Sequence, residues 1–143
     1  MKNRKFPKYI IESQNNIKSG NQKLRFEWFQ TESFPSQWVL QAIISGLNHP
    51  VGLLWADFDL NKSVGISNIY VSEDYRRCGI ATRLLNKVWD WLDNDGLKMI
   101  HTGKFNDKSG PWGNKCGFRK DNIIGYKLLR KDWLKSESFK SIS

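Results

Sequence analysis

The sequence is poor in cysteine and histidine, and their positions match no metal-binding or disulfide pattern. Its 143 residues include 2 Cys and 2 His. Cys78 and Cys116 lie far apart in the chain, His49 and His101 stand alone, and the spacings C-x-x-C and H-E-x-x-H do not occur. Zinc sites and the disulfide frameworks of small secreted domains need such clusters. The sequence therefore predicts neither.

Long apolar runs are missing as well. No run approaches the ~18 residues of a membrane span, and the basic start Met-Lys-Asn-Arg-Lys has no apolar stretch behind it. We therefore expect a soluble, cytoplasmic protein with no membrane partner. Apolar volume is nevertheless ample, with 39% hydrophobic residues and 7 Trp. This suits one domain over 1–143, with flexible ends at 1–8 and 135–143.

Positive charge is concentrated at the two ends of the sequence. The formal net charge is +9, from 23 Lys and Arg against 14 Asp and Glu. Residues 1–23 hold six bases and one acid (+5), residues 24–97 six bases and nine acids (−3), and residues 98–143 eleven bases and four acids (+7). Two interpretations stay open, namely attraction to an anionic partner such as nucleic acid or a phosphate-bearing cofactor, and a surface charge that serves solubility.

Short apolar runs separated by turn residues predict a β-meander in the first half of the chain. Such runs, punctuated by Gly, Pro and Asn, are typical of strands joined by turns. A weak edge strand is expected at Tyr9–Ile11, and further strands are expected at Leu24–Phe29, Trp38–Ile44, Val51–Phe58 and Ile66–Val71.

The pattern changes to a helical period from Ile80. Apolar residues recur at three- and four-residue steps up to Leu92, and Gly96 provides the stop. A strand at Leu97–Thr102 follows, so the segment that starts at Ile66 forms a β-α-β unit with parallel strands. The rest comprises a Gly- and Pro-rich stretch at 108–117 and strand-like runs at Phe118–Arg119 and Ile123–Arg130. Together these elements predict a mixed α/β (α+β) domain with a mostly antiparallel central sheet.

The turn between the strand that ends at Val71 and the helix is the segment most informative about function. It reads Ser-Glu-Asp-Tyr-Arg-Arg-Cys-Gly-Ile-Ala over 72–81. Free backbone N–H groups and the positive end of the helix dipole bind anions at such a position. Gly79 lets the backbone approach phosphate oxygens, and Arg76 and Arg77 add positive charge. We therefore expect a diphosphate here, although the P-loop and dinucleotide fingerprints are both absent. The alternative is an ordinary strand-to-helix turn.

On these residues the sequence resembles the GCN5-related N-acetyltransferase (GNAT) family. In that family a strand ending in Val leads into a Gln/Arg-X-X-Gly-X-Gly/Ala loop and a helix, and here the three loop positions hold Arg76, Gly79 and Ala81. A second, looser family spacing downstream is matched by Asn106, Ser109, Gly117 and Phe118. The resemblance covers about Val51 to Arg130.

The resemblance implies a GNAT-like fold with a splayed gap in the sheet, and acetyl-CoA as co-substrate. The strand end would pair with the pantetheine arm, the loop amides would hold the pyrophosphate, and Asn106 would contact the cofactor arm. The implied cofactor-binding residues are Ile69, Tyr70, Val71, Arg76, Arg77, Cys78, Gly79, Ile80, Ala81, Thr82 and Asn106. The implied activity is acetyl transfer to a primary amine of a protein, small molecule or nucleic acid, by a monomer or homodimer.

Three departures from the family pattern concern the chemistry. The Tyr that often protonates the departing thiolate is replaced by Gly113, and the carboxylate that often precedes the Val is replaced by Ser67 and Asn68. The long segment that normally houses two helices over the acceptor site is reduced to 31–37. The acceptor side is therefore expected to be open.

Groups for proton transfer must be sought elsewhere, and we take Tyr70, Tyr126 and Ser109 as the catalytic candidates. Other side chains near the expected site have simpler interpretations. These are Glu73 and Asp74 as turn and cap groups, Asp57 and Asp59 as strand-end carboxylates or holders of an acceptor ammonium, His101 as a core histidine, Cys78 as a bystander, and Trp112 as a hydrophobic plug or a stacking platform.

Two alternatives to an acetyltransferase of proteins or small amines stay open. A nucleic-acid-directed acyltransferase acting on tRNA or DNA is favoured by the basic ends and the open acceptor side. A catalytically weak CoA-binding or nucleic-acid-binding module is favoured by the missing Tyr and carboxylate. Polyamine and aminoglycoside acceptors are less expected, because a polycation needs an acidic pocket.

Overall fold

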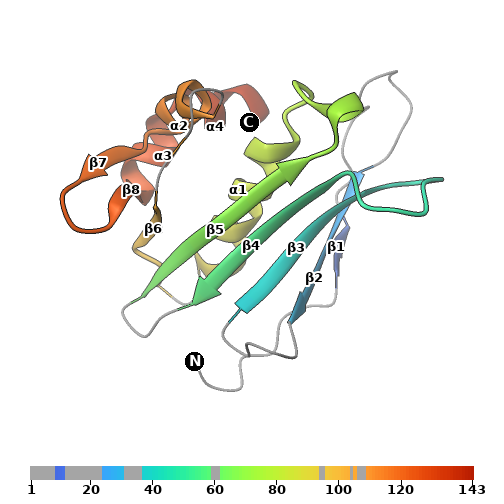
Figure 1. Ribbon diagram of the computed structural model, residues 1–143, viewed down its shortest axis with the longest axis horizontal. Helices are drawn as coiled ribbons and strands as arrows, with labels where there is room; N and C mark the ends of the chain where they lie inside the picture. The colour runs from blue at the N-terminus through green and yellow to red at the C-terminus, as the bar shows by residue number, and fades with distance from the viewer. Residues whose placement is uncertain are drawn as a thin grey trace.

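The computed structural model describes residues 9–11, 24–30, 37–58, 62–93, 96–103, 105 and 109–143. These residues form one eight-stranded sheet and four α-helices (Figure 1). The strands are β1 (Tyr9–Ile11), β2 (Leu24–Gln30), β3 (Gln37–Ile44), β4 (Gly52–Phe58), β5 (Ser63–Val71), β6 (Met99–Thr102), β7 (Arg119–Asp121) and β8 (Gly125–Leu129). The helices are the short 3-10 turn η1 (Glu73–Tyr75), α1 (Ile80–Leu92), α2 (Gly110–Cys116), α3 (Arg130–Lys135) and α4 (Glu137–Ile142).

The sheet has the order β1-β2-β3-β4-β5-β6-β8-β7. Strands β1 to β5 are antiparallel neighbours in chain order, which confirms the predicted meander and the edge strand at Tyr9–Ile11. Strands β5 and β6 are parallel and are joined through α1, which confirms the predicted β-α-β unit. Strand β8 then pairs antiparallel with both β6 and β7.

Helix α1 covers one face of the sheet and builds the core with it. Figure 1 shows the helix behind β4 and β5. Its residues Leu84, Leu85 and Val88 are fully buried, and β4 alternates buried and half-buried side chains as a strand with one core face does. Each buried aliphatic side chain stabilises the fold by about 1.5–3 kcal/mol relative to exposure. Among the described helices, none is long and apolar enough to cross a membrane.

Helix α2 corrects the sequence interpretation of 108–117 as an irregular Gly- and Pro-rich stretch. Two glycines and a proline in its seven residues are weak helix formers, so the pattern conceals the helix. Pro111 lies in the first turn, where a missing N–H costs nothing. Burial of Gly113 and Cys116 against the rest of the protein provides the stabilisation that these weak helix formers do not. The predicted strand Ile123–Arg130 is shorter at both ends, because Ile123 and Ile124 belong to the turn before β8 and α3 begins at Arg130.

The segment 135–143, for which the sequence predicts a flexible end, contains α4. The side chain of Ser136 caps this helix, since its Oγ accepts a hydrogen bond from the Phe139 amide at 3.1 Å. Ser138 is buried and accepts a hydrogen bond from the Sγ of Cys116 at 3.4 Å. Helix α4 contacts α1, α2 and α3, and therefore closes the core at this end of the chain.

The buried thiol of Cys116 gives stability a dependence on alkaline pH. Burial raises its pKa to about 12, although the hydrogen bond with Ser138 opposes the shift. The folded state thus keeps a proton that the unfolded chain releases above about pH 8.5. This contribution to stability is complete below that pH and is lost as the pH rises toward 12.

We therefore expect the free energy of unfolding to fall between pH 8 and pH 10 by about 1–2 kcal/mol more in the wild type than in Cys116→Ala. Urea unfolding of both proteins at the two pH values measures the difference. Equal losses would show that the thiol ionises as readily in the folded state as in the unfolded chain.

Candidate functional site

The loop between β5 and α1 has the geometry of an anion site. Gly79 precedes α1 with φ 80° and ψ 13°, the left-handed conformation that glycine adopts without strain. Arg77 also has a positive φ of 64°, which costs a non-glycine residue about 1–2 kcal/mol. Within the part of the chain that the structure describes, no side chain caps the N-terminus of α1. The first N–H groups of the helix therefore remain available to a ligand.

Two arginines, the exposed Arg76 and the half-buried Arg83, donate hydrogen bonds to backbone carbonyl groups at this loop. Arg76 donates from Nε to the carbonyl oxygen of Val71 at 2.9 Å, and its guanidinium carbon lies 5.9 Å from the ring centroid of Tyr70. Arg83, one turn into α1, donates from Nη1 to the carbonyl oxygen of Cys78 at 3.4 Å. Burial lowers the pKa of the Arg83 guanidinium, but arginine remains charged near neutral pH. Arg83 is absent from the sequence-based site, although its position four residues after Gly79 places it under the loop.

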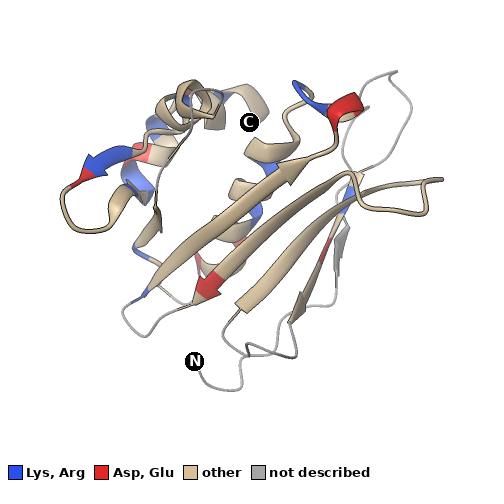
Figure 2. Cartoon of the chain, in the orientation of Figure 1, with Lys and Arg blue, Asp and Glu red and all other residues tan. Residues whose placement is uncertain are grey.

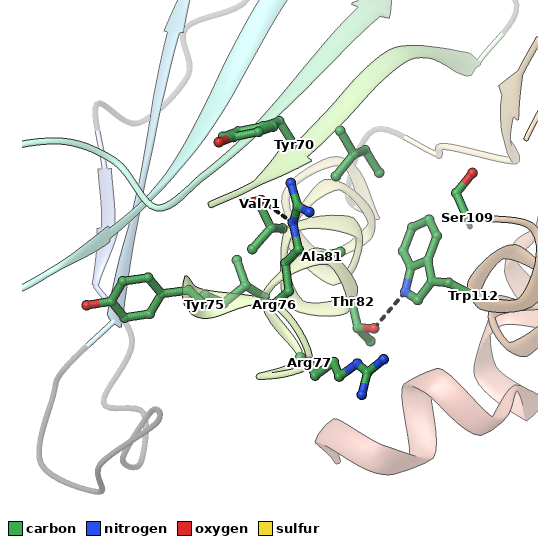
Figure 3. A pocket seen from close by; sticks show the side chains of 12 residues that line it. Tyr70, Val71, Tyr75, Arg76, Arg77, Ala81, Thr82, Ser109 and Trp112 are labelled. Carbon is green, nitrogen blue, oxygen red and sulfur yellow. Dashed lines mark hydrogen bonds between the residues drawn. The ribbon is translucent and has the colours of Figure 1, made fainter. Parts of the chain in front are cut away.

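A cleft of about 860 Å³ lies beside the loop. Figure 3 shows its walls, with the end of β5 on one side and α2 on the other. Of the cofactor-binding residues predicted from the resemblance, Cys78 does not line the cleft, and Asn106 lies outside the described residues. The lining residues are Ile69, Tyr70, Val71, Tyr75, Arg76, Arg77, Gly79, Ile80, Ala81, Thr82, Ser109 and Trp112.

A second cavity, of about 250 Å³, marks the gap between β5 and β6. The two strands pair only from Ser63 and Met99 to Ile66 and Thr102. At that last pair the Thr102 Oγ1 donates to the Ile66 carbonyl oxygen at 2.9 Å, while β5 continues to Val71 beside β4 alone. The pairing of β4 with β5 skips Ser67, which is a β-bulge. The splayed gap implied by the resemblance is therefore present.

Trp112 connects α2 to α1 at the border of the two cavities. Its indole Nε1 donates to the Oγ1 of Thr82 at 3.0 Å (Figure 3). The half-buried ring also packs against the hydrophobic core. These contacts favour the plug interpretation over the stacking platform.

Gly113 faces an aromatic ring that occupies the space of the missing tyrosine. A Cβ at Gly113 would lie 2.8–2.9 Å from three ring atoms of Phe105. The Phe105 ring in turn packs edge-on against Trp112, Phe118 and Tyr126. A tyrosine cannot enter α2 at this position without moving the cluster.

The three catalytic candidates differ in their access to the cavities. Ser109 lines both, and Tyr70 lines the cleft with 47% of its surface exposed. Tyr126 lines neither, because its ring packs against Phe105 at 5.0 Å between centroids. Glu73 and Asp74 lie exposed in η1, and Asp59 is outside the described residues. The described residues contain no group of three or more His, Cys, Asp or Glu that could hold a metal ion.

Comparison with known proteins agrees with this geometry. The model of the Acetyltransferase (GNAT) family matches residues 8–118, whereas no curated protein matches the sequence. A GNAT-family acetyltransferase from Staphylococcus aureus Mu50 superposes with a TM-score of 0.58 at 18% identity, over 66% of this chain and 68% of its own. A protein from Bacillus anthracis solved in complex with acetyl coenzyme A gives 0.57 at 21%, over 66% and 63%. Tetrahymena GCN5 gives 0.53 at 16%, over 68% and 58%.

Proposed function

The chain belongs to the GNAT family of acetyltransferases, and we propose that it transfers the acetyl group of acetyl-CoA to a primary amine. The observation that carries the proposal is the continuity of the two cavities, since Ile69, Ser109 and Trp112 line both the cleft at the loop and the gap between β5 and β6. In this proposal the amides after Gly79 hold the pyrophosphate, and the pantetheine arm runs along β5 into the gap.

The free edge of β5 supports the chemistry. Acyl transfer needs a polarised thioester carbonyl, a neutral amine and a proton for the thiolate. Beyond Ile66 no strand pairs with β5 on the β6 side within the described residues, and the Val71 carbonyl at the strand end accepts from Arg76. The other N–H and C=O groups of this edge can therefore pair with the pantetheine arm, and an N–H directed into the gap can polarise the carbonyl.

The proposal is tested first by cofactor binding. Cys78 is half-buried beside the loop, with its Sγ 3.7 Å from the carbonyl oxygen of Arg76, whereas Cys116 is fully buried. We expect acetyl-CoA to slow alkylation of Cys78 in a peptide-mapping experiment and to bind by calorimetry. Release of CoA thiol with a lysine peptide, spermidine or total tRNA then measures transfer. Absence of both binding and protection would overturn the proposal.

Ser109 is the proposed proton donor to the departing thiolate, because it alone of the three candidates lines the gap as well as the cleft. We expect Ser109→Ala to lower kcat at least 10-fold, since general acid catalysis contributes about 10²-fold or more. Tyr126→Phe serves as the matched control with kcat unchanged, and Tyr70→Phe tests the remaining candidate. A wild-type kcat in Ser109→Ala would show that Ser109 is not the proton donor, and Tyr70 or water would then be the donor.

A nucleic-acid-directed acyltransferase is the second candidate, and the distribution of unpaired charge favours it. Figure 2 shows basic residues on β7, β8 and the helices near the C-terminus, while β3 and most of β4 and β5 are uncharged. Five exposed lysines in this part form no ion pair in the described structure, and they are Lys115, Lys120, Lys131, Lys135 and Lys140. The bases of residues 1–8 lie outside the described residues.

If these lysines contact phosphates, tRNA affinity should fall linearly on a double logarithmic plot against salt concentration. Each neutralised phosphate contributes a slope of about −0.7 to −0.9, so Lys120→Gln combined with Lys131→Gln should reduce the slope by about 1.5. Filter binding at several salt concentrations measures this, and acetyl-CoA affinity should not change. If tRNA does not bind even at low ionic strength, the positive charge of these lysines serves solubility. Protein or small amine acceptors would then be favoured.

A further inference from the structure

A row of paired residues crosses the sheet on the face opposite α1. Its members are Gln37, Asp57, Gly65, His101, Lys127 and Arg119, from β3, β4, β5, β6, β8 and β7 in turn. Residues paired across strands direct their side chains to the same face. Their chain neighbours Val64, Ile100 and Leu128 are buried in the core, so the row faces away from it. The interpretation of His101 as a core histidine is therefore wrong, and its ring is half-buried on the outer face.

Within this row the imidazole of His101 fills the space that a side chain at Gly65 would need. A Cβ at Gly65 would lie 2.8 Å from Cε1, 3.3 Å from Nε2 and 3.4 Å from Nδ1 of the ring. The next residues along the two strands are Ile66 and Thr102, where β5 and β6 separate. Both of these line the cavity in the gap. The ring thus lies over β5, one residue below the base of the gap.

The charged residues that share this row with His101 are Lys127, Arg119 and Asp57. Lys127 on β8 pairs with Asp121 at 3.5 Å, and Arg119 on β7 pairs with Asp132 at 3.1 Å. Asp57 on β4 is separated from His101 by β5, where the row has only Gly65. The bulge residue Ser67 and its neighbour Asn68, which also line the gap, carry no ionisable group. Two titratable side chains flank the base of the gap among the described residues, since His101 precedes Thr102 and Tyr126 pairs with Thr102. The Tyr126 ring packs against Phe105, so His101 is the one on the outer face.

We infer that His101 is the base that takes a proton from the acceptor amine, an assignment that rests on the proposed acetyltransferase function. The protonated amine gives one proton to the neutral imidazole, directly or through one water. The free amine then adds to the thioester carbon, the C–S bond breaks, and the second proton on nitrogen passes to the departing sulfur through the hydroxyl of Ser109. The products are the amide and CoA thiol, and the imidazolium returns its proton to solvent. The amine enters from the outer face of the sheet, opposite α1.

The test compares His101→Gln with two other variants in the thiol-release assay, using the lysine peptide, spermidine and tRNA as acceptors. We expect kcat to fall about 10²-fold in His101→Gln, with acetyl-CoA affinity by calorimetry unchanged. The acid limb of the kcat/KM profile should disappear as well. Gly65→Ala keeps the histidine but displaces its ring, so kcat should also fall. His49→Gln, at the other histidine, should leave the rate unchanged.

The outcomes separate this assignment from the proposed function. Thiol release that is unchanged in rate and pH profile in His101→Gln would overturn the role of His101 and leave the acetyltransferase proposal intact. Absence of thiol release from the wild type with all three acceptors would overturn both. If His101→Gln does not fold, the role of His101 is tested by the kcat of Gly65→Ala and by the pH profile of the wild type. A wild-type kcat in Gly65→Ala together with a profile that has no acid limb would overturn it. The ring signals of the two histidines give a reading without turnover, because acetyl-CoA should shift that of His101 and not that of His49 in NMR spectra.

Discussion

Replacement of Gly79 by glutamate is expected to weaken acetyl-CoA binding by about 10³-fold. The left-handed conformation at this position costs a residue with a Cβ about 1–2 kcal/mol. The new Cβ would also lie 2.7 Å from the Nη1 of Arg83, so the guanidinium that supports the loop must move. A carboxylate beside the proposed pyrophosphate site then repels the ligand, and each charge-assisted hydrogen bond lost removes a further 1.5–3 kcal/mol or so. A total of about 4 kcal/mol corresponds to three orders of magnitude in affinity.

Gly46→Glu is the matched control for this experiment. Gly46 has a similar φ of 91°, and no atom lies within 4 Å of the position that a Cβ would occupy there. It therefore carries the same conformational cost at a site that is not part of the cleft. Calorimetry should show wild-type affinity for Gly46→Glu and no measurable binding for Gly79→Glu, with native circular dichroism in both. Near-wild-type binding by Gly79→Glu would mean that the loop does not hold the cofactor.

Gly125→Ala is expected to destabilise the fold by about 3 kcal/mol or more. Gly125 begins β8 with φ 94°, and a Cβ there would overlap the carbonyl oxygen of Gly103 and lie 2.7 Å from that of Thr102. These are backbone atoms, so a rotamer change cannot relieve the overlap. The conformational cost of about 1–2 kcal/mol adds to an overpacking cost of about 1–3 kcal/mol.

Gly46→Ala again separates the two costs, because it has the positive φ without the overlap. Urea unfolding should show a loss of about 1–2 kcal/mol for Gly46→Ala and a clearly larger loss for Gly125→Ala. Equal losses would mean that the strands can move apart at Gly125 at little cost. The gap would then be more compliant than the contacts of Thr102 and Gly103 indicate.

The parts of the fold that follow a regular pattern could be predicted from the sequence. Strands β2 to β5 alternate or concentrate apolar residues between turn residues, and α1 repeats them at helical spacing, so periodicity alone locates both. The loop was recognisable because Arg76, Gly79 and Ala81 lie close together in the chain. Helix α2 was not, since its glycines and proline oppose the helix that tertiary burial imposes.

The site beyond the loop depends on contacts between distant residues, which leave no local pattern. Where the gap opens is decided by the last pair of β5 and β6, and Ile66 and Thr102 are 36 positions apart. The position of the His101 ring likewise depends on a glycine in another strand. A glycine inside an apolar run predicts only a weaker strand, and not which side chain will cover it.

The entropic cost of forming strand pairs differs between the two halves of the sheet, because the paired residues are separated by different lengths of chain. Contacts between β3 and β4 close a loop of about ten residues, as between Ala42 and Gly52. The contact between β5 and β6 at the base of the gap joins residues 36 positions apart. Loop-closure entropy makes the second kind about 1 kcal/mol more costly to form. The meander thus supplies the contacts available to the folding transition state, and β6 and β8 join afterward. Destabilising changes on β6 and β8, Gly125→Ala among them, should then accelerate unfolding and leave the folding rate almost unchanged.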